Sequence, residues 1–169
     1  MGKMKIRLFD LDSDFDVVKT WISDERTHML WSANRIPFPL SKASFKEFLQ
    51  DIASSNGDIP YVAVDDDGKP IGFYVYSFNE DTKEGMLKFV VVDSKMRGKG
   101  IAREMLRLAV SAAFEDETVE AVHLNVFSAN VPARRCYEKT GFVERSVTSD
   151  AFSFGDESWD RINMVIKPK

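Results

Sequence analysis

The sequence predicts an α/β (α+β) fold with a mixed β-sheet and helices on both of its faces. Strand-like segments follow one another in the first half of the chain, whereas strands and helices alternate after residue 86. The alternating part requires a crossover connection, which makes two of the strands parallel. Of the 169 residues, 44% are hydrophobic, so we expect one domain over residues 1–169 with a core of its own.

The first part of the chain predicts one strand and two helices. Residues 4–9 (MKIRLF) alternate between apolar and polar side chains, as a half-buried strand does. Residues 10–23 and 41–55 carry apolar side chains at helical spacing, and Gly57 marks the end of the second helix. Residues 27–39 contain two prolines and several aromatic residues, so we expect an irregular loop there.

Three strands follow in succession. Residues 60–78 contain two of them, joined by a turn with the sequence DDGK. Residues 86–93 (MLKFVVVD) form a nearly continuous apolar run rich in valine. Such a run is typical of a strand that is buried on both faces, so this strand belongs in the middle of the sheet.

The last part alternates between helices and strands. Apolar side chains from Ile101 onward recur at i, i+4, i+7 and i+8, which predicts a helix. Residues 121–127 (AVHLNVF) predict a strand. Residues 130–142 predict a short helix, with a proline in its first turn and a glycine at its end. Residues 142–154 and 159–167 then predict a closing hairpin.

Composition argues against several kinds of protein. The net charge of −4 shows no broad excess of Lys and Arg, so we expect no nucleic-acid partner. No apolar run has the length of a membrane span, and the N-terminus lacks the apolar core of a secretion signal. We therefore expect a cytoplasmic protein without a membrane partner. Cys136 is the only cysteine, which excludes an intrachain disulfide, and no His/Cys cluster has metal-ligand spacing.

The segment Arg97–Ala102 (RGKGIA) joins the valine-rich strand to the helix that follows. The start of a helix carries unpaired N–H groups and a partial positive charge, and glycines let an anion approach the backbone closely. The segment lacks both the P-loop pattern and the dinucleotide fingerprint G-x-G-x-x-G. It is therefore either a cradle for the pyrophosphate of another ligand or an exposed turn that needs glycine.

This segment resembles the [QR]-x-x-G-x-[GA] signature of the GNAT family of N-acetyltransferases. Residues 130–142 (NVPARRCYEKTGF) are similar to a second element of that family, N-x-x-A-x-x-x-Y-x-K-x-G-F. The resemblance covers Val62–Phe142, and residues 28–49 are weakly similar to the ribosomal-protein alanine acetyltransferase branch. It implies a GNAT-type mixed, mostly antiparallel sheet of about six or seven strands.

The resemblance implies an enzyme that moves the acetyl group of acetyl-CoA directly to a primary amine. The amine could belong to a protein N-terminus, a lysine, a polyamine or a small amino compound. One alternative is a catalytically silent sensor of the same fold that binds acyl-CoA. Another is a flavin or nucleotide binder, which would need a fingerprint that this sequence lacks. The oligomeric state stays open, with a homodimer among the expected forms.

The resemblance also implies which residues bind acetyl-CoA. Amides of the glycine turn would bind the pyrophosphate, and the valine-rich strand would pair with the pantetheine arm. An N–H group of that strand would stabilise the oxyanion. Asn130 would contact the cofactor as well as cap its helix. The predicted acetyl-CoA-binding residues are Val90, Val91, Val92, Arg97, Gly98, Lys99, Gly100, Ile101, Ala102 and Asn130.

By the same resemblance, Tyr137 is the predicted catalytic residue. A phenol with a pKa near 10 can protonate a departing thiolate whose thiol has a pKa near 8.5. The alternative is a core aromatic residue. We expect Cys136 to be a small buried side chain and not a nucleophile. The general base stays unassigned, because Glu84, Asp93 and His123 each have an ordinary structural explanation and a water relay is equally allowed.

Residues 25–38 are too polar and too aromatic for an ordinary connector. In the GNAT family this region and the closing hairpin wall the acceptor site, so we predict His28, Trp31 and Arg35 as substrate-binding residues. The alternative is a hydrophobic plug beneath the sheet. Four acidic residues of the hairpin would suit a cationic amine or form a solvated loop: Asp150, Asp156, Glu157 and Asp160.

Overall fold

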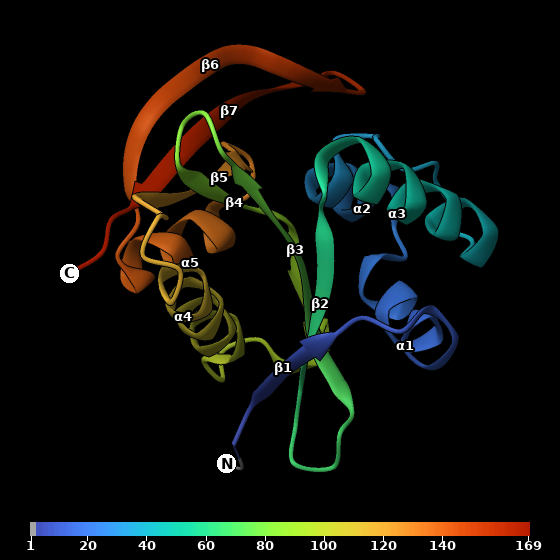
Figure 1. The fold of residues 1–169 in the computed structure, drawn as a ribbon. Helices are drawn as coiled ribbons and strands as arrows, with labels where there is room; N and C mark the ends of the chain where they lie inside the picture. The colour runs from blue at the N-terminus through green and yellow to red at the C-terminus, as the bar shows by residue number, and fades with distance from the viewer. Residues whose placement is uncertain (1–2) are drawn as a thin grey trace.

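The computed structural model describes residues 3–169, which form one seven-stranded sheet and five α-helices (Figure 1). In chain order the elements are β1 (Lys5–Leu8), α1 (Leu11–Val18), the 3₁₀ helix η1 (Lys19–Ile22), α2 (Glu25–Ser32), α3 (Lys42–Asn56), β2 (Ile59–Val64), β3 (Pro70–Asn79), β4 (Glu84–Val92), the 3₁₀ helix η2 (Ser94–Met96), α4 (Ile101–Phe114), β5 (Ala121–Phe127), α5 (Val131–Thr140), β6 (Val143–Phe154) and β7 (Glu157–Ile166).

The sheet has the strand order β1-β2-β3-β4-β5-β7-β6. Every neighbouring pair is antiparallel except β4 and β5, which run parallel because α4 connects them. This arrangement confirms the predicted mixed, mostly antiparallel sheet. The closing hairpin forms as expected, and β6 and β7 arch away from the rest of the sheet (Figure 1).

Helices cover both faces of the sheet, as predicted. Helices α4 and α5 lie on one face and α1 to α3 on the other (Figure 1). The first face buries a core that includes Met105 and Leu124. The second face buries an aromatic core around Trp31, Phe45 and Phe73. Because each helical layer has its own core, the central strands are buried on both sides.

The expectation of an irregular loop over residues 27–39 is wrong in its first part, where helix α2 forms. The side chain of Asp24 caps this helix by accepting a 2.9 Å hydrogen bond from the backbone N–H of Thr27. The helix ends at Ala33, which has a left-handed φ of 51°. A capped helix of eight residues gives too short a periodic pattern to stand out beside two following prolines.

Across residues 3–169, no helix has both the length and the apolar character needed to cross a bilayer.

Candidate active site

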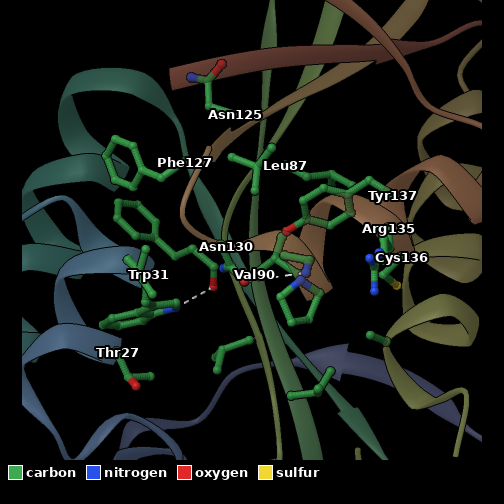
Figure 2. A pocket seen from close by; sticks show the side chains of 18 of the residues that line it. Thr27, Trp31, Leu87, Val90, Asn125, Phe127, Asn130, Arg135, Cys136 and Tyr137 are labelled. Carbon is green, nitrogen blue, oxygen red and sulfur yellow. Dashed lines mark hydrogen bonds between the residues drawn. The ribbon is translucent and has the colours of Figure 1, made fainter. Parts of the chain in front are cut away.

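Strands β4 and β5 pair only over their first halves. Their parallel register runs from Glu84 opposite Ala121 to Leu87 opposite Leu124 and then stops. Beyond this point a cavity of about 960 Å³ lies between the two strands, and residues from both helical layers line it (Figure 2). Within residues 3–169, the edge of β4 that faces the cavity has no strand partner, so its N–H and C=O groups can bind an extended ligand.

Strand β4 contains a bulge where it enters the cavity. Its register with β3 shifts between Phe73 and Val75, which leaves Phe89 and Val90 outside the regular ladder. Phe89 has a φ of 52°, a backbone conformation that is uncommon for a bulky residue. Its carbonyl accepts a 2.7 Å hydrogen bond from the indole Nε1–H of Trp31. Val90, the second residue of the bulge, lines the cavity.

The turn after β4 leaves space in front of its backbone. Gly98 and Gly100 have φ values of 80° and 75°, which favour glycine. A Cβ atom placed on either glycine would meet nothing within 4 Å. Gly100 is the N-cap of α4, and no side chain caps the helix. The first N–H groups of α4 therefore have no capping side chain within residues 3–169, and the glycines in front of them leave room for a ligand.

Four cationic side chains line the cavity near this turn. They come from the turn itself, from α4 and from α5: Arg97, Arg103, Arg135 and Lys139. None of them forms an ion pair with another residue of the range 3–169. Uncompensated guanidinium and ammonium groups beside a bare helix start make this end of the cavity suitable for phosphate groups.

Helix α5 places three polar side chains on the cavity. Tyr137 is buried, and its ring packs edge-on against Phe142, while its hydroxyl points into the cavity toward β4 (Figure 2). Burial raises the pKa of this hydroxyl above the usual value near 10, so it remains a proton donor at neutral pH. Asn130 caps the helix by accepting a 3.4 Å hydrogen bond from the N–H of Ala133. Burial also raises the pKa of the Cys136 thiol.

The hairpin β6–β7 reaches across to α2. Arg26 of α2 donates two hydrogen bonds of 3.0 Å to the carboxylate of Glu157 on β7. Its guanidinium also lies 5.5 Å from the ring centre of Trp159. The indole N–H of Trp159 donates to the same carboxylate at 3.1 Å. These contacts connect two elements that lie far apart in the chain, and Arg26 lines the cavity.

A comparison with protein families matches residues 19–142 to the Acetyltransferase (GNAT) family. The chain belongs to the GNAT family. The match includes the bulged strand, the glycine turn and α5, but it does not include the hairpin β6–β7. It confirms the resemblance seen in the sequence. The finer similarity to the ribosomal-protein alanine acetyltransferase branch stays a prediction.

Several curated GNAT-type proteins are similar in sequence. An uncharacterized SPbeta prophage-derived N-acetyltransferase, YokL of Bacillus subtilis, is 27% identical over 117 residues, which cover 69% of this chain and 65% of that protein. The aminoglycoside N(6')-acetyltransferase type 1 of Klebsiella pneumoniae is 25% identical over 82% of this chain and 73% of its own. The spermine/spermidine N(1)-acetyltransferase of Bacillus subtilis is 29% identical, over 45% of this chain and 54% of its own.

Solved structures share the GNAT fold over nearly the whole chain. Spermidine N-acetyltransferase from Vibrio cholerae, in complex with CoA and spermine, superposes with a TM-score of 0.81 at 21% identity. The match covers 97% of this chain and 95% of that one. At this level of identity the likeness establishes the fold.

The structure brings most of the predicted acetyl-CoA residues together around the GNAT cavity. All of them line it except Lys99, whose side chain is exposed on the turn between the two glycines. Trp31 and Arg35 of the predicted acceptor wall also line the cavity. The predicted Tyr137 also lines it, and its side chain extends from α5 toward β4 (Figure 2).

His28, the third residue predicted for the acceptor wall, does not line the cavity. Its side chain is fully buried, and its Nε2 lies 2.8 Å from the carbonyl oxygen of Ile36. The ring packs edge-on against Trp31 and Phe38, with centroid distances of 5.7 and 5.2 Å. His28 is therefore part of the hydrophobic plug, because the packing of α2 buries its ring against Trp31 and Phe38.

None of the three acidic or basic groups considered as a general base lines the cavity. Arg145 binds both oxygens of Glu84, at 2.8 and 3.1 Å, and its hydrogen bonds lower the pKa of that carboxyl. Asp93 caps η2 by accepting from the N–H of Lys95. Burial lowers the pKa of His123. Each of them has a structural role that the geometry explains.

Sequence reasoning missed the part of the wall that comes from β5 and β7. Asn125 and Phe127 lie at alternate positions of β5, and Arg161 lies directly opposite Phe127 on β7, so all three share one face of the sheet. The alternation within residues 121–127 was the available signal. It identifies which residues share a face, but it does not show that this face borders a cavity.

Proposed function

We propose that this chain transfers the acetyl group of acetyl-CoA directly to a primary amine. One observation carries the proposal. A single cavity joins an uncapped helix start at Gly100, a strand edge on β4 without a partner in the described chain, and the hydroxyl of Tyr137. These are the three features that a CoA thioester needs: a place for its pyrophosphate, a partner for its amide-containing arm, and a donor for its sulfur.

Acetyl-CoA would bind along β4 and the turn that follows it. The amides of residues 97–102 would hold the pyrophosphate, assisted by the unpaired cations at that end of the cavity. The amide groups of the pantetheine arm would pair with the free edge of Val90, Val91 and Val92. Asn130 would contact the arm while it caps α5. Lys99 would contribute through its backbone, because its side chain is exposed.

The reaction begins when a neutral amine attacks the thioester carbonyl, which forms the C–N bond and moves electrons to the carbonyl oxygen. A backbone N–H of the bulged strand near Val90 would stabilise this oxyanion. The C–S bond then breaks, and Tyr137 would protonate the departing thiolate. Burial keeps this hydroxyl protonated at neutral pH, so the proton is in place when sulfur leaves.

The acceptor determines how much help a base must give. Deprotonating a lysine-like amine with a pKa near 10.4 costs about 4–5 kcal/mol at pH 7, whereas an α-amine near 8 costs about 1 kcal/mol. Glu84, Asp93 and His123 lie outside the cavity lining. We therefore propose that a water molecule relays the proton from the amine out of the cavity.

The names of the relatives support this function. They include acetyltransferases for aminoglycosides and for spermine and spermidine, all of which are amines. The competing function is a sensor that binds acyl-CoA without turnover. A cavity that continues past Tyr137 to Trp31 and Arg35 favours transfer, because a sensor needs no second substrate site.

A panel of amines tests the proposal. Purified protein is mixed with acetyl-CoA and each amine, released thiol is followed over time, and the products are identified by mass spectrometry. We expect acetylated product from at least one class of amine. Tight binding of acetyl-CoA with no turnover across the panel would support the sensor function. If acetyl-CoA did not bind, both the acetyltransferase and the sensor function would be wrong.

We also propose that the protein works in the cytoplasm as a homodimer, without nucleic acid or a membrane. Strand β6 lies at the edge of the sheet, and its apolar residues Val143 and Val147 are 61% and 47% exposed. An open edge with exposed valines suits pairing with a second copy. Light scattering during size-exclusion chromatography tests the dimer, and a monomer at micromolar concentration would contradict it.

A further inference from the structure

The acceptor half of the cavity carries two arginines, Arg35 and Arg161, that form no ion pair within the described chain. We propose that the acceptor amine belongs to a molecule that also carries an anionic oxygen group, either a carboxylate or a phosphate. This inference rests on the proposed function and specifies its second substrate. It also departs from the polycationic substrates that the names of the relatives suggest.

All charged side chains that line the cavity, among residues 3–169, are arginine or lysine. Those near the glycine turn lie where the phosphates of CoA would bind. The remainder lie on the other side of the β4–β5 split, on α2, the loop after it, β4 and β7: Arg26, Arg35, Lys88 and Arg161. The whole chain has a net charge of −4, so overall composition does not explain why no carboxylate lines the acceptor side of the cavity among the described residues.

Two of these four cations have a carboxylate partner behind them. Arg26 binds Glu157 through two hydrogen bonds of 3.0 Å. Lys88 donates a 2.9 Å hydrogen bond to Asp58, which is only 2% exposed. These pairs are electrically compensated, so they shape the wall and add little net charge to the cavity.

The other two cations have no ion-pair partner within residues 3–169. Arg35 lies with its guanidinium carbon 5.3 Å from the ring centre of Phe89 and 5.7 Å from that of Phe48. Aromatic contacts of this kind hold a guanidinium without using its N–H donors. Those donors remain free for a ligand in the cavity.

Arg161, on the wall that β7 forms, likewise has no ion-pair partner among residues 3–169. It lies directly across from Phe127 in the β5–β7 ladder, and both residues line the cavity. Its side chain makes one long hydrogen bond, 3.4 Å to the Oγ1 of Thr148, and is otherwise exposed. Guanidinium groups bind carboxylates and phosphates through paired N–H donors, so each of these two arginines is a suitable partner for an anionic group of the acceptor.

The acidic residues of the hairpin do not reverse this charge. Glu157 is bound to Arg26, and Asp160 alternates to the face of β7 opposite Arg161. The Oδ1 atom of Asp160 accepts from the backbone N–H of Asp150. Asp156 lies in the exposed turn at the tip of the hairpin. None of these carboxylates lines the cavity, so a polycation would meet Arg35 and Arg161 without a compensating group.

Matched pairs of acceptors test the inference directly. β-Alanine is compared with β-alaninamide, and phosphoethanolamine with ethanolamine, with spermidine as the polycation. We expect the anionic member of at least one pair to have a kcat/KM at least tenfold higher than its neutral partner and than spermidine. Amidation also lowers the pKa of the amine, which favours the amide chemically, so the first comparison is biased against the proposal. The two pairs distinguish a carboxylate from a phosphate.

Substitutions then locate the anion. Arg35→Gln and Arg161→Gln should each raise KM for the anionic acceptor at least fivefold, with KM for acetyl-CoA and for the neutral partner unchanged. Arg161→Glu should shift the preference toward spermidine. Arg107→Gln is the matched control, because Arg107 is an exposed arginine of α4 that pairs with Glu104 outside the cavity.

The outcomes separate the two proposals. If wild-type protein acetylates spermidine or the neutral amines better than their anionic partners, the anionic acceptor is wrong and the acetyltransferase function stands. Equal effects of Arg161→Gln and Arg107→Gln would also overturn the anion site. If acetyl-CoA binds and no acceptor is acetylated, the proposed function itself fails.

Discussion

The indole N–H of Trp31 donates a 2.7 Å hydrogen bond to the carbonyl of Phe89, across 58 positions of the chain. The two rings also pack edge-on, with their centroids 5.8 Å apart. Phe89 is the bulge residue with a left-handed φ of 52°, a conformation that needs support from its surroundings. Helix α2 thus holds the backbone of β4 in the shape that exposes it to the cavity.

Replacing Trp31 by phenylalanine should therefore impair both stability and catalysis. The carbonyl of Phe89 would lose its buried donor, which costs about 1–3 kcal/mol in the free energy of unfolding. We expect a lower kcat as well, because the proposed oxyanion donor near Val90 lies in the bulge. Trp21→Phe is the control, since Trp21 is buried in the same layer but donates no hydrogen bond to the carbonyl of Phe89, whose indole donor is Trp31. Denaturant unfolding and steady-state kinetics measure the two effects, and equal kcat values in both variants would refute the supporting role of Trp31.

Substituting Gly100 by glutamate should abolish acetyl-CoA binding. The side chain would occupy the open space in front of the α4 start and place a negative charge beside the pyrophosphate. Gly68→Glu controls for backbone strain, because Gly68 also has a positive φ, 80°, and open surroundings, but lies in a surface turn. Calorimetry with acetyl-CoA should detect binding only in the control. If folded Gly100→Glu bound acetyl-CoA with an unchanged Kd, the proposal that residues 97–102 bind the pyrophosphate would be wrong.

Tyr137→Phe should lower kcat at least about tenfold, within the range of general-acid contributions, and leave the Kd for acetyl-CoA unchanged. The phenylalanine ring would still pack against Phe142, so only the late proton donor is lost. Burial raises the pKa of Tyr137, so the wild-type hydroxyl should stay protonated as pH rises from 7 to 10. The wild-type kcat should therefore show no loss from ionisation of this tyrosine in that range. A variant with wild-type kcat, measured where chemistry limits the rate, would make Tyr137 a packing residue.

Cys136→Ala should retain most of the activity. The thiol lines the cavity beside Tyr137, but burial raises its pKa, which disfavours the thiolate that a nucleophile needs. Intact-protein mass spectrometry after mixing with acetyl-CoA should show no acetyl group on Cys136. Detection of an acetylated cysteine that disappears when an amine is added would instead indicate a covalent intermediate.

His28→Ala should destabilise the fold without weakening acceptor binding. The change removes a fully buried ring and its contact with the carbonyl of Ile36, which costs about 2–4 kcal/mol by analogy with other large-to-small core substitutions. Thermal unfolding measures this loss. KM values for both substrates should stay within twofold of wild type at a temperature where the variant is folded. If the KM for the acceptor rose while the KM for acetyl-CoA did not, His28 would be a substrate-binding residue after all.

Local sequence patterns were sufficient to predict the elements that we propose bind the donor. Glycine positions and the start of a helix specify the turn at residues 97–102, and helical spacing places Tyr137 two turns after Asn130. The strand–turn–helix order carried the family resemblance and hence the sheet architecture. These features depend on neighbours along the chain, so the sequence reveals them directly.

The acceptor side depended on contacts between distant segments. The divergence of β4 and β5 after Leu87 and the bulge at Phe89 follow from strand register and from the packing of α2. The same packing buries His28, although it lies one helical turn from Trp31, which lines the cavity. Arg161 joins the wall only because β7 pairs with β5. Register and packing arise from surfaces that meet when the chain folds, so only the tertiary structure decided which side chains face the cavity and which charges stay unpaired.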